Sequence, residues 1–198
     1  MEKVDILLSV YKPNKKYLIE QLKSLNDQNY PNIEVIINDD CPEFPCDHEI
    51  FESYLTKVPY RFLQQDKKNL NYTKSFEKLV KASTGDFIAF CDQDDIWFPN
   101  KISRSVETLK KENALLVASD RQIIDGDGNV LVYKYRDEHH DQTESWHTGD
   151  DIATRNLIIT HAVGMALVAR GNFARSILPF STYTGHDKWI ISCASVEG

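Results

Sequence analysis

Three carboxylates stand within four consecutive residues, Asp92-Gln93-Asp94-Asp95. They directly follow an apolar run at residues 86–91, whose composition predicts a buried strand. Carboxylates this close repel one another, and a divalent cation that also binds a diphosphate would relieve the repulsion, because such cations prefer oxygen ligands. A solvated acidic turn in front of the next helix explains the same residues, and the tetrapeptide alone supports both interpretations about equally.

A second acidic pair, Asp39-Asp40, follows the apolar run at residues 33–37. In open α/β sheets, ligands bind beyond the carboxyl ends of the strands, so this pair would share a rim with the first cluster. A carboxylate there can accept a hydrogen bond from a base N–H or a ribose hydroxyl. Ser9 and Tyr11 end an earlier apolar run and could complete a nucleotide cleft. Helix capping or loop solvation is the competing explanation for the acidic pair.

The elements that must position these residues alternate between strand and helix patterns over the first 120 residues. Apolar, β-branched runs of strand length are separated by segments in which apolar residues recur every three or four positions. This order predicts right-handed parallel crossovers and an α/β fold with a mostly parallel sheet flanked by helices. We expect strands at residues 4–10, 33–37, 60–64, 86–91 and 115–119, and helices at residues 17–25, 48–55, 72–82 and 99–111.

The regular alternation weakens after residue 120. A Gly-Asp-Gly-Asn tetrapeptide at residues 126–129 predicts a hairpin turn between two short strands. No signal ends the last helix before Gly198, so we expect a single domain whose C-terminal portion is missing. The other elements expected here are a polar loop or flap at residues 135–151, an apolar segment at residues 162–169 and a helix that begins at Asp187.

The composition of the 198 residues argues against several classes of protein. The 23 Lys and Arg residues against 30 Asp and Glu residues give a net charge of −7, which disfavours binding to nucleic-acid backbones. The 41% apolar share indicates a globular chain, and no apolar run approaches the roughly 20 residues of a membrane span. The strand pattern begins at Val4, without a signal-peptide pattern. The cysteines lack metal-type spacing and are expected to be reduced thiols of a cytoplasmic protein: Cys41, Cys46, Cys91 and Cys193.

Other kinds of catalytic site are less well supported by the residues. Neither a G-x-G-x-x-G pattern nor a P-loop is present, so a diphosphate would have to be held mainly through a metal ion. Adjacent histidines such as His139 and His140 usually project differently from a polar loop, which disfavours a zinc site. A glycosidase uses two carboxylates that face each other across the scissile bond, and its reaction would not need the polar residues expected to bind a nucleotide at the strand ends.

Four segments, in order along nearly the whole chain, resemble glycosyltransferases of family 2 and are most similar to the rhamnosyltransferase-like branch. The segment ILLSVYKPNKKYLIEQLKSLNDQNYPNIEVIINDDCP resembles the opening strand, helix and strand of the family. The segment NLNYTKSFEKLVKASTGDFIAFCDQDDIWFPNKI resembles the helix and strand that deliver the family's D-x-D signature. The segment HAVGMALVARGNF resembles the family's acceptor-side strand segment, and GHDKWI resembles the family's motif that supplies the catalytic base. A D-x-D pair alone is a weak signal, whereas four ordered matches are specific. The resemblance implies the GT-A fold, a mostly parallel sheet flanked by helices with a small antiparallel segment on the acceptor side.

The resemblance also implies donor-binding roles at matching positions. Asp39 would contact a uracil- or thymine-like base. Asp92 and Asp94 would form the D-x-D pair at the donor diphosphate and bind Mg²⁺ or Mn²⁺, with Asp94 as the first choice for a direct ligand. The remaining donor-binding residues would be Ser9, Tyr11 and Asp40.

Asp187 falls where inverting members of the family keep their general base. The usual Glu-Asp pair is His186-Asp187 here, a departure that also occurs in the rhamnosyltransferase-like branch. Asn71 stands where a glycine often follows the Asn-Leu dipeptide, and asparagine tolerates the positive φ that a glycine would permit. The residues expected on the acceptor side are Asp95, Trp97, His186 and Trp189.

Together these observations predict a metal-dependent, inverting glycosyltransferase. It would transfer a sugar from a UDP- or dTDP-sugar, with dTDP-rhamnose among the candidates, to a glycan or lipid-linked acceptor in surface-polysaccharide synthesis. Residues 1–120 would bind the nucleotide sugar and residues 121–198 the acceptor. The resemblance implies a cytoplasmic protein, with peripheral association at the inner face of the membrane. The alternatives are a non-catalytic nucleotide-sugar-binding module and a nucleotidyltransferase, whose Gly- and Lys/Arg-rich triphosphate grip is not present at residues 9–14.

Overall fold

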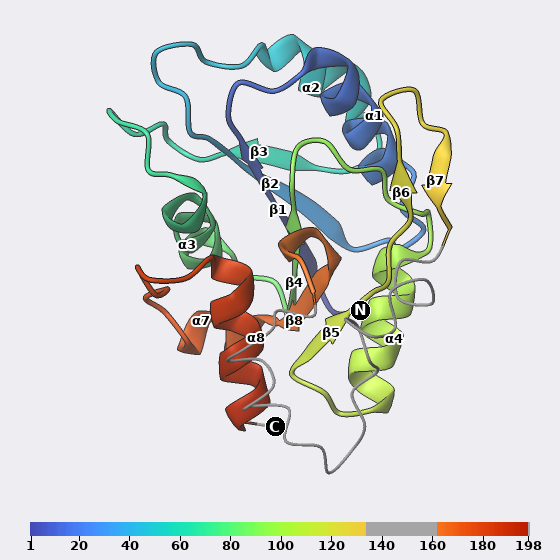
Figure 1. Ribbon diagram of the computed structural model, residues 1–198, viewed down its shortest axis with the longest axis vertical. Coiled ribbons are helices and arrows are strands. Elements are labelled where there is room, and N and C mark those ends of the chain that lie inside the picture. Colours follow the sequence, from blue (N-terminus) through green and yellow to red (C-terminus); the bar gives the residue numbers. More distant parts are fainter. Residues whose placement is uncertain (134–161, 198) are drawn as a thin grey trace.

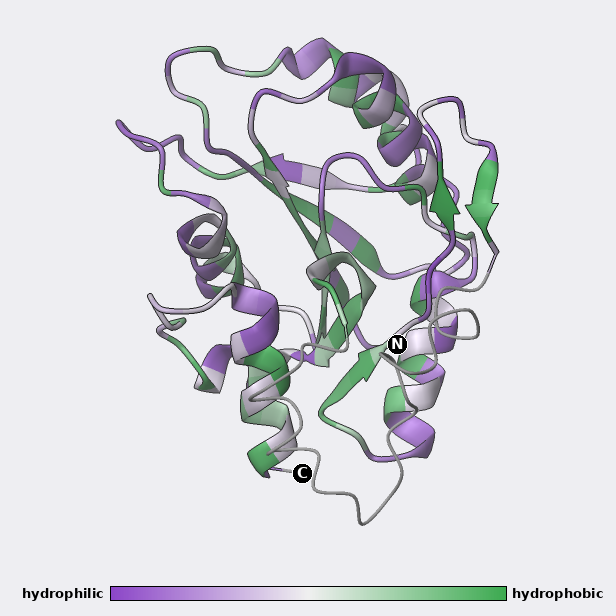
Figure 2. Cartoon of the chain, in the orientation of Figure 1, coloured by the Kyte–Doolittle hydropathy of each residue, from purple (hydrophilic) through white to green (hydrophobic). Residues whose placement is uncertain are grey.

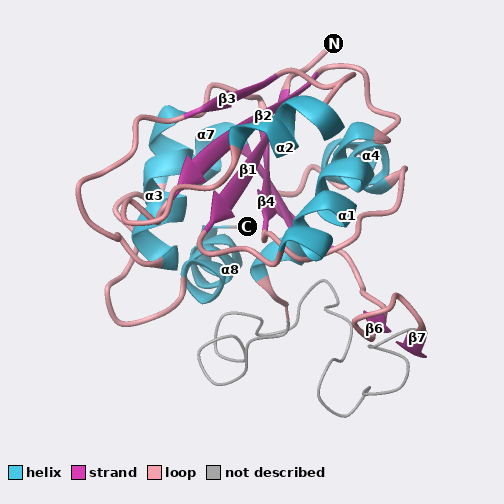
Figure 3. Cartoon of the chain, turned by 90° about the horizontal axis from the view of Figure 1, so that it is seen from above, coloured by secondary structure: helices cyan, strands magenta, loops and turns pink. Residues whose placement is uncertain are grey.

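The computed structural model describes residues 1–133 and 162–197 of the chain. A six-stranded sheet in the order β3-β2-β1-β4-β8-β5 forms the centre, and β6 and β7 form a separate two-stranded sheet. Helices cover both faces of the large sheet (Figures 1 and 3). The architecture is therefore the mixed α/β arrangement that the alternating sequence pattern predicts.

Four neighbouring strands of the large sheet run parallel, with β1 at the centre between β2 and β4, and β3 beside β2. The first residues of β1, β2 and β4 are in register, as are the residues near their carboxyl ends, so these three strands end at one edge of the sheet. The bounds of these strands are Val4–Val10 for β1, Ile33–Asp39 for β2, Tyr60–Phe62 for β3 and Phe87–Cys91 for β4.

The helices between the parallel strands begin at side-chain caps. Asn14 Oδ1 accepts a hydrogen bond from Lys16 N at 2.9 Å at the start of α1, and Asn71 Oδ1 accepts from Lys74 N at 3.2 Å at the start of α3. Asn71 has a φ of 67°, which confirms the left-handed conformation expected at this position. The helices are α1 (Lys15–Asn26), α2 (His48–Tyr54) and α3 (Tyr72–Ala82).

The second part of the chain inserts an antiparallel strand into the large sheet. The strand β8 (Leu167–Arg170) lies between β4 and β5 (Leu116–Ala118) and is antiparallel to both. A short 3₁₀ turn, η1 (Gly164–Ala166), leads into β8. The remaining elements are helices α4 (Lys101–Lys111), α7 (Gly171–Ser176) and α8 (His186–Glu197) and the hairpin strands β6 (Ile123–Ile124) and β7 (Val130–Val132).

Each face of the large sheet is covered by its own hydrophobic cluster. Along β1, Ile6 and Leu8 pack with α1, α2 and α4, while Leu7 between them packs with α3, α7 and α8. Alternate side chains of a strand point to opposite faces, so burial on both sides explains why β1 is apolar at nearly every position. Figure 2 shows the same distribution, with hydrophobic residues concentrated on the central strands.

Most of the elements expected from the sequence are confirmed, with ends that differ by a few residues. The expectation for residues 115–119 was wrong in one respect, because β5 joins the sheet through the antiparallel strand β8 and pairs with no parallel strand among residues 1–133 and 162–197. An apolar pattern reports burial and does not specify the direction of the neighbouring strand. The short helix α7 was not anticipated, and the expected loop at residues 135–151 lies outside the described residues.

Two further expectations can be compared with the described part of the chain. All four cysteines are free, in agreement with the expected thiols. None of the helices described is both long enough and apolar enough to cross a membrane.

Candidate active site

Three parallel strands deliver polar residues to one pocket at their carboxyl ends. Ser9 and Tyr11 come from the end of β1, Asp40 from the end of β2, and Asp92 and Asp94 from the end of β4. The pocket has a volume of about 460 Å³, within the ~300–1,000 Å³ typical of small-molecule sites. Its wall is completed by Gln93 and by residues around the start of α3: Asn69, Asn71, Tyr72 and Phe76.

Gln93 fixes the end of β1 against the loop after β4. Its Oε1 accepts a hydrogen bond from Tyr11 N at 2.8 Å, and its Nε2 donates to Tyr11 O at 3.0 Å. The Tyr11 ring itself is 45% exposed at the mouth of the pocket. An exposed ring on a fixed backbone can stack against a planar base.

Asp39, the residue expected to contact a base, is buried and braces the loop that follows β2. Its two carboxylate oxygens accept hydrogen bonds from Cys41 N at 3.0 Å and Cys46 N at 2.8 Å. This loop-bracing position agrees with the alternative interpretation of the acidic pair.

Asp40 is the member of the pair that lines the pocket. Its oxygens accept hydrogen bonds from Leu70 N at 2.7 Å and from Asn69 Nδ2 at 2.8 Å, which ties the end of β2 to the segment before α3. Burial raises the pKa of the Asp40 carboxyl, and the hydrogen bond from Leu70 N partly offsets this effect. Of the two acidic residues, Asp40 therefore has the better position to meet a ligand.

A chain of hydrogen bonds extends from Ser9 along the face of the sheet that α3 covers. Ser9 Oγ and Ser75 Oγ lie 2.7 Å apart, and Asn38 Nδ2 donates to Ser75 Oγ at 2.8 Å. Lys78 Nζ then donates to Asn38 Oδ1 at 2.7 Å and to Asp66 Oδ2 at 2.6 Å. Because its members satisfy one another, this network can stay buried and hold Ser9 in a fixed position.

The acidic cluster after β4 is crowded with like charges. Burial, followed by repulsion from Asp95, Asp94 and Asp187, raises the pKa of Asp92 to about 7. Burial and the charge of Asp94 raise the pKa of Asp95 to about 6, although nearby basic side chains partly offset the shift. Every charged neighbour that affects Asp92 therefore disfavours its ionised form.

The described residues fit a metal ion only if a ligand shares its coordination. Within residues 1–133 and 162–197, no group of three or more His, Cys, Asp or Glu side chains could hold a metal ion. The carboxylates of Asp92 and Asp94 are oxygen donors whose mutual repulsion a divalent cation would relieve, and phosphate oxygens can complete such a coordination shell. The donor set therefore suits Mg²⁺ or Mn²⁺ bound together with a diphosphate.

Asp187 lies in the first turn of α8 and is partly exposed. Its charge contributes to the raised pKa of Asp92, so α8 brings this carboxylate to the same acidic rim. Lys188 N donates to Asp187 Oδ1 at 2.7 Å. A Cβ on Gly185 would lie only 2.6 Å from the same oxygen, so a glycine there lets the carboxylate fold back over the start of α8. The strand-end acids and the expected base are therefore neighbours.

His186 and Trp189, expected on the acceptor side, are occupied in the packing of α8. His186 is 5% exposed and stacks on Phe76 with 4.1 Å between the ring centres. Burial lowers the pKa of His186 to about 4, so its ring is neutral at pH 7. Trp189 Nε1 donates a hydrogen bond to Ile177 O at 3.0 Å. His186 therefore offers no exposed face to an acceptor, because the aromatic neighbours of α8 bury it, whereas Trp189 is half-buried and only its Nε1 is used by a backbone carbonyl.

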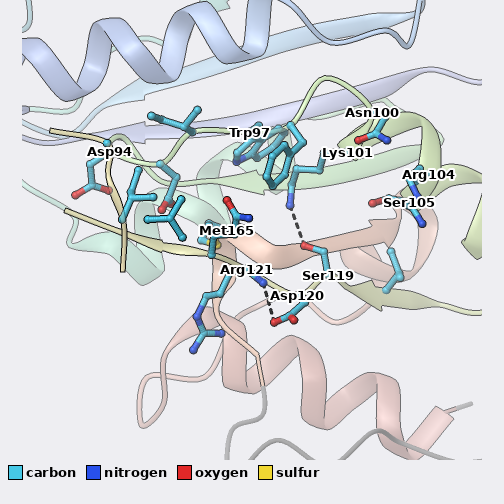
Figure 4. A pocket seen from close by; sticks show the side chains of 18 of the residues that line it. Asp94, Trp97, Asn100, Lys101, Arg104, Ser105, Ser119, Asp120, Arg121 and Met165 are labelled. Atoms are coloured by element: carbon cyan, nitrogen blue, oxygen red, sulfur yellow. Dashed lines mark hydrogen bonds between the residues drawn. The ribbon is translucent and has the colours of Figure 1, made fainter. Parts of the chain in front are cut away.

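Asp95 and Trp97 line a second, larger pocket of about 640 Å³ (Figure 4). Its walls come from α4, from the segment after β5 and from the β6–β7 hairpin. Asp94 lines both pockets, so the two meet at the acidic cluster. A ligand in either pocket would therefore approach the same carboxylate.

The sequence of residues 5–175 matches the profile described as "Glycosyl transferase family 2". The chain belongs to this family. The resemblance noted in the sequence is thus confirmed at the level of the family, on most of the chain.

Curated relatives of this family 2 chain include proteins from archaea and bacteria. An uncharacterized glycosyltransferase, MJ1057 of Methanocaldococcus jannaschii, is 28% identical over 129 residues, which cover 65% of this chain and 44% of the relative. The dTDP-rhamnosyl transferase RfbG of Shigella flexneri is 30% identical over 129 residues, which cover 59% of this chain and 39% of the relative. The chain therefore matches less than half the length of either protein.

Solved structures confirm that the family 2 chain has the GT-A type of fold. The structure of residues 1–349 of Staphylococcus aureus TarS in complex with UDP-GlcNAc superposes with a TM-score of 0.69 at 18% identity, covering 98% of this chain and 53% of TarS. The mannosyltransferase PcManGT of Pyrobaculum calidifontis, in complex with GDP-Man and Mn²⁺, gives a TM-score of 0.67 at 14% identity and covers 94% of this chain and 50% of PcManGT. At these identities the likeness concerns the fold alone.

Several pocket residues of this family 2 chain were not identified from the sequence. Asn69 and Tyr72 reach the first pocket because the segment before α3 folds over the end of β2. The sequence feature that could have indicated them is the Asn-Leu-Asn tripeptide directly before the helix pattern. Lys101 and Arg104 line the second pocket, and their spacing of three on α4 was the signal that places both on one helix face.

Proposed function

We propose that the protein transfers a sugar from a nucleoside diphosphate donor to a glycan or lipid-linked acceptor, with inversion and with the help of a divalent cation. The observation that carries this proposal is the convergence of Ser9, Asp40, Asp92 and Asp94 on one pocket at the carboxyl ends of three parallel strands. In open α/β sheets this edge is where nucleotide ligands bind. Membership of glycosyl transferase family 2 supports the same reaction class.

The donor would occupy the pocket of about 460 Å³. The exposed ring of Tyr11 is placed to stack on the base, and Asp40 is placed to accept a hydrogen bond from the base or ribose. Asp39 would contribute indirectly, because it holds the loop beside them. Asp92 and Asp94 would hold a cation at the diphosphate, and this cation would stabilise the negative charge of the leaving nucleoside diphosphate. The pyrimidine and the sugar, dTDP-rhamnose among the candidates, belong to the proposal.

Asp187 would act as the general base of the transfer. The acceptor hydroxyl attacks the anomeric carbon from the side opposite the diphosphate, and the Asp187 carboxylate removes the hydroxyl proton as the new bond forms. The neutral, buried His186 ring would position Asp187 by anchoring the start of α8 on Phe76. His186 and Trp189 would then act through packing rather than through contact with the acceptor.

The acceptor would enter from the pocket of about 640 Å³, which meets the donor pocket at Asp94. Asp95 and Trp97 lie on this side, so the acceptor-side role expected for them is retained in the proposal. The division into a donor part, residues 1–120, and an acceptor part, residues 121–198, is modified, because α4 belongs to the first part and lines the acceptor pocket. A cytoplasmic setting at the inner face of the membrane is part of the same proposal.

The proposed reaction is tested by the release of nucleoside diphosphate from UDP-GlcNAc and dTDP-rhamnose in the presence of Mn²⁺, with water as the acceptor. We expect Asp187→Asn to lower the turnover about a hundredfold or more, since general-base catalysis contributes roughly 10²–10⁴-fold, and to leave nucleotide affinity within about twofold. Asp127→Asn, at a hairpin position that is largely exposed, is the matched control and should retain full turnover. Nucleotide binding with equal, background release by all three proteins would instead support the non-catalytic binding module.

A further inference from the structure

The second pocket has opposite charge at its two ends. Asp94 lies at one end, where the pocket meets the donor site, and Arg104 lies at the other end beside Asn100 and Ser105 (Figure 4). Lys101 lies between them and points into the pocket (Figure 4). The part of the pocket beyond Asp94 therefore combines two cationic side chains with hydroxyl and amide groups.

Lys101 is a cation with little compensation from the protein. Its Nζ donates to Ser119 Oγ at 3.2 Å and lies 4.8 Å from the centre of the Trp97 ring. No carboxylate in residues 1–133 and 162–197 lies within 4.0 Å of this ammonium group, although Asp95 is close enough to act on it through space. Burial lowers the pKa of Lys101 to about 8, and the charge of Asp95 offsets part of that shift. A buried ammonium in this state would gain from an anionic ligand.

Arg104 offers further donors in the same pocket. It is exposed, lies one helical turn after Lys101 and lines the pocket with it. The indole of Trp97 is 3% exposed, and its Nε1 is itself buried, so the charged donors that the pocket exposes are those of Lys101 and Arg104.

Asp95 is the pocket carboxylate that acts on Lys101 through space, whereas Asp94 lies at the opposite end of the pocket from Arg104 (Figure 4). Asp94 belongs to the pair whose charge the proposed cation would neutralise. Asp120 Oδ1 accepts a hydrogen bond from Arg121 N at 2.8 Å, and both residues lie across the pocket from Arg104 (Figure 4). An anionic ligand beside Lys101 and Arg104 would thus be attracted by these two cations more strongly than it is repelled by the carboxylates of the pocket.

We infer that this pocket binds an acceptor that carries a phosphate group, held by Lys101 and Arg104. The inference rests on the proposed function, since it names the chemical class of the acceptor. Arginine and lysine are the usual partners of phosphate oxygens, and Phe98, which is 60% exposed, provides apolar surface for the sugar or polyol beside the phosphate. The phosphate belongs either to a soluble glycan or polyol phosphate or to a lipid headgroup.

The test is a titration of the whole protein with glycerol phosphate, followed by NMR of the indole N–H signals of its three tryptophans. The Trp97 signal should shift on binding, and both Arg104→Gln and Lys101→Gln should weaken the affinity about tenfold through loss of a charged hydrogen-bond donor. Lys111→Gln is the matched control, because this lysine is an exposed cation on α4 whose ammonium pairs with Glu112. Arg104 is exposed, so its variant tests the inference even if Lys101→Gln does not fold.

A second arm replaces glycerol phosphate by vesicles of phosphatidylcholine with and without phosphatidic acid. Binding of either phosphate source that depends on Lys101 and Arg104 supports the inference and identifies the source. Equal affinities for all four proteins, or binding that leaves the Trp97 signal unshifted, would overturn it. A titration of the same samples with UDP and Mn²⁺ separates the proposed sugar transfer from the proposed phosphate site. If the protein binds glycerol phosphate but not the nucleotide, only the sugar transfer is contradicted.

Discussion

The two halves of the large sheet, called the donor and acceptor halves after the proposed function, are built in different ways. On the donor side, β1, β2 and β4 are parallel strands of five to seven residues, and nearly all of their side chains are buried. On the acceptor side, β5 has three residues that are only partly buried, and it reaches the sheet through the antiparallel β8. The chain connects β1 to β2 and β2 to β3 by direct parallel crossovers, whereas β4 pairs with the distant β1 and β8 pairs with the distant β5.

This difference explains how reliably each half places its functional residues. A parallel strand followed by a polar residue delivers that residue to a known edge of the sheet, so Ser9, Asp40 and Asp92 converge because β1, β2 and β4 run in the same direction. Asp187 reaches the same edge only through the packing of α8 on α3 and β4. Substitutions in the acceptor half should therefore leave the donor site unchanged, whereas they should displace Asp187, the proposed general base.

The largest expected contrast is in core packing. Ile6, in the centre of the sheet, is fully buried, so Ile6→Ala should lower the free energy of unfolding by about 3–4 kcal/mol. Leu116 in β5 is partly buried at the edge, so Leu116→Ala should cost less than about 2 kcal/mol. Urea unfolding of both variants measures the contrast. Equal losses would contradict the view that the two halves differ in their packing.

The anchor of α8 should make stability depend on pH. Burial lowers the pKa of His186 from 6.5 to about 4, so the unfolded chain takes up a proton between these values and the folded chain does not. The contribution of His186 to stability is therefore full above pH 6.5 and decreases as the pH falls toward 4, by about 3 kcal/mol in total. His186→Leu should remove this dependence.

Urea unfolding at pH values above 6.5 and near 4 checks this prediction. His48→Gln, a change at an exposed histidine in α2, is the control and should retain the pH dependence of the unmodified protein. An unchanged slope in His186→Leu would show that another group is responsible.

A smaller effect is expected where α3 holds the segment before α8. Glu77 accepts hydrogen bonds from Lys74 Nζ at 2.8 Å, Lys81 Nζ at 2.6 Å and Phe180 N at 3.0 Å. Burial alone would raise the pKa of Glu77, but these hydrogen bonds outweigh it and lower the pKa to about 2. Glu77→Gln should cost about 1–2 kcal/mol at neutral pH.

Because the pKa of Glu77 is lowered on folding, its contribution is present above pH 4.5 and is lost as the pH falls toward 2. Thermal unfolding in this range should show a shallower acid loss for Glu77→Gln than for the unmodified protein. Glu107→Gln, at an exposed position of α4, is the control. The assignment is wrong if Glu107→Gln and Glu77→Gln behave alike.

The sequence predicted the donor half well because its signals are local. The burial of both faces left continuous apolar runs, and the strand bounds at residues 4–10 agree with β1. The positive φ of Asn71 was likewise readable, since few residues tolerate it. The position of β8 between β4 and β5 was not predictable in this way, because strand order depends on pairing between distant segments.

The candidate site was predicted in part. The sequence placed Asp40, Asp92 and Asp94 at one rim, and the structure brings them to one pocket. It did not distinguish the roles of Asp39 and Asp40, because two adjacent side chains on a strand end point in different directions and only the fold shows which one faces the pocket. The burial of His186 was equally hidden, since the rings around it come from α3, β4 and the segment before α8.

The most direct test of the account is calorimetric titration of UDP and dTDP, with and without Mn²⁺, on the unmodified protein, Asp94→Asn and the control Asp127→Asn. We predict binding of at least one nucleotide that Mn²⁺ strengthens about tenfold or more, with this gain lost in Asp94→Asn and retained in Asp127→Asn. Nucleotide affinity that is equal with and without Mn²⁺, or that Asp94→Asn leaves unchanged, would contradict a metal-assisted donor site at the ends of the parallel strands.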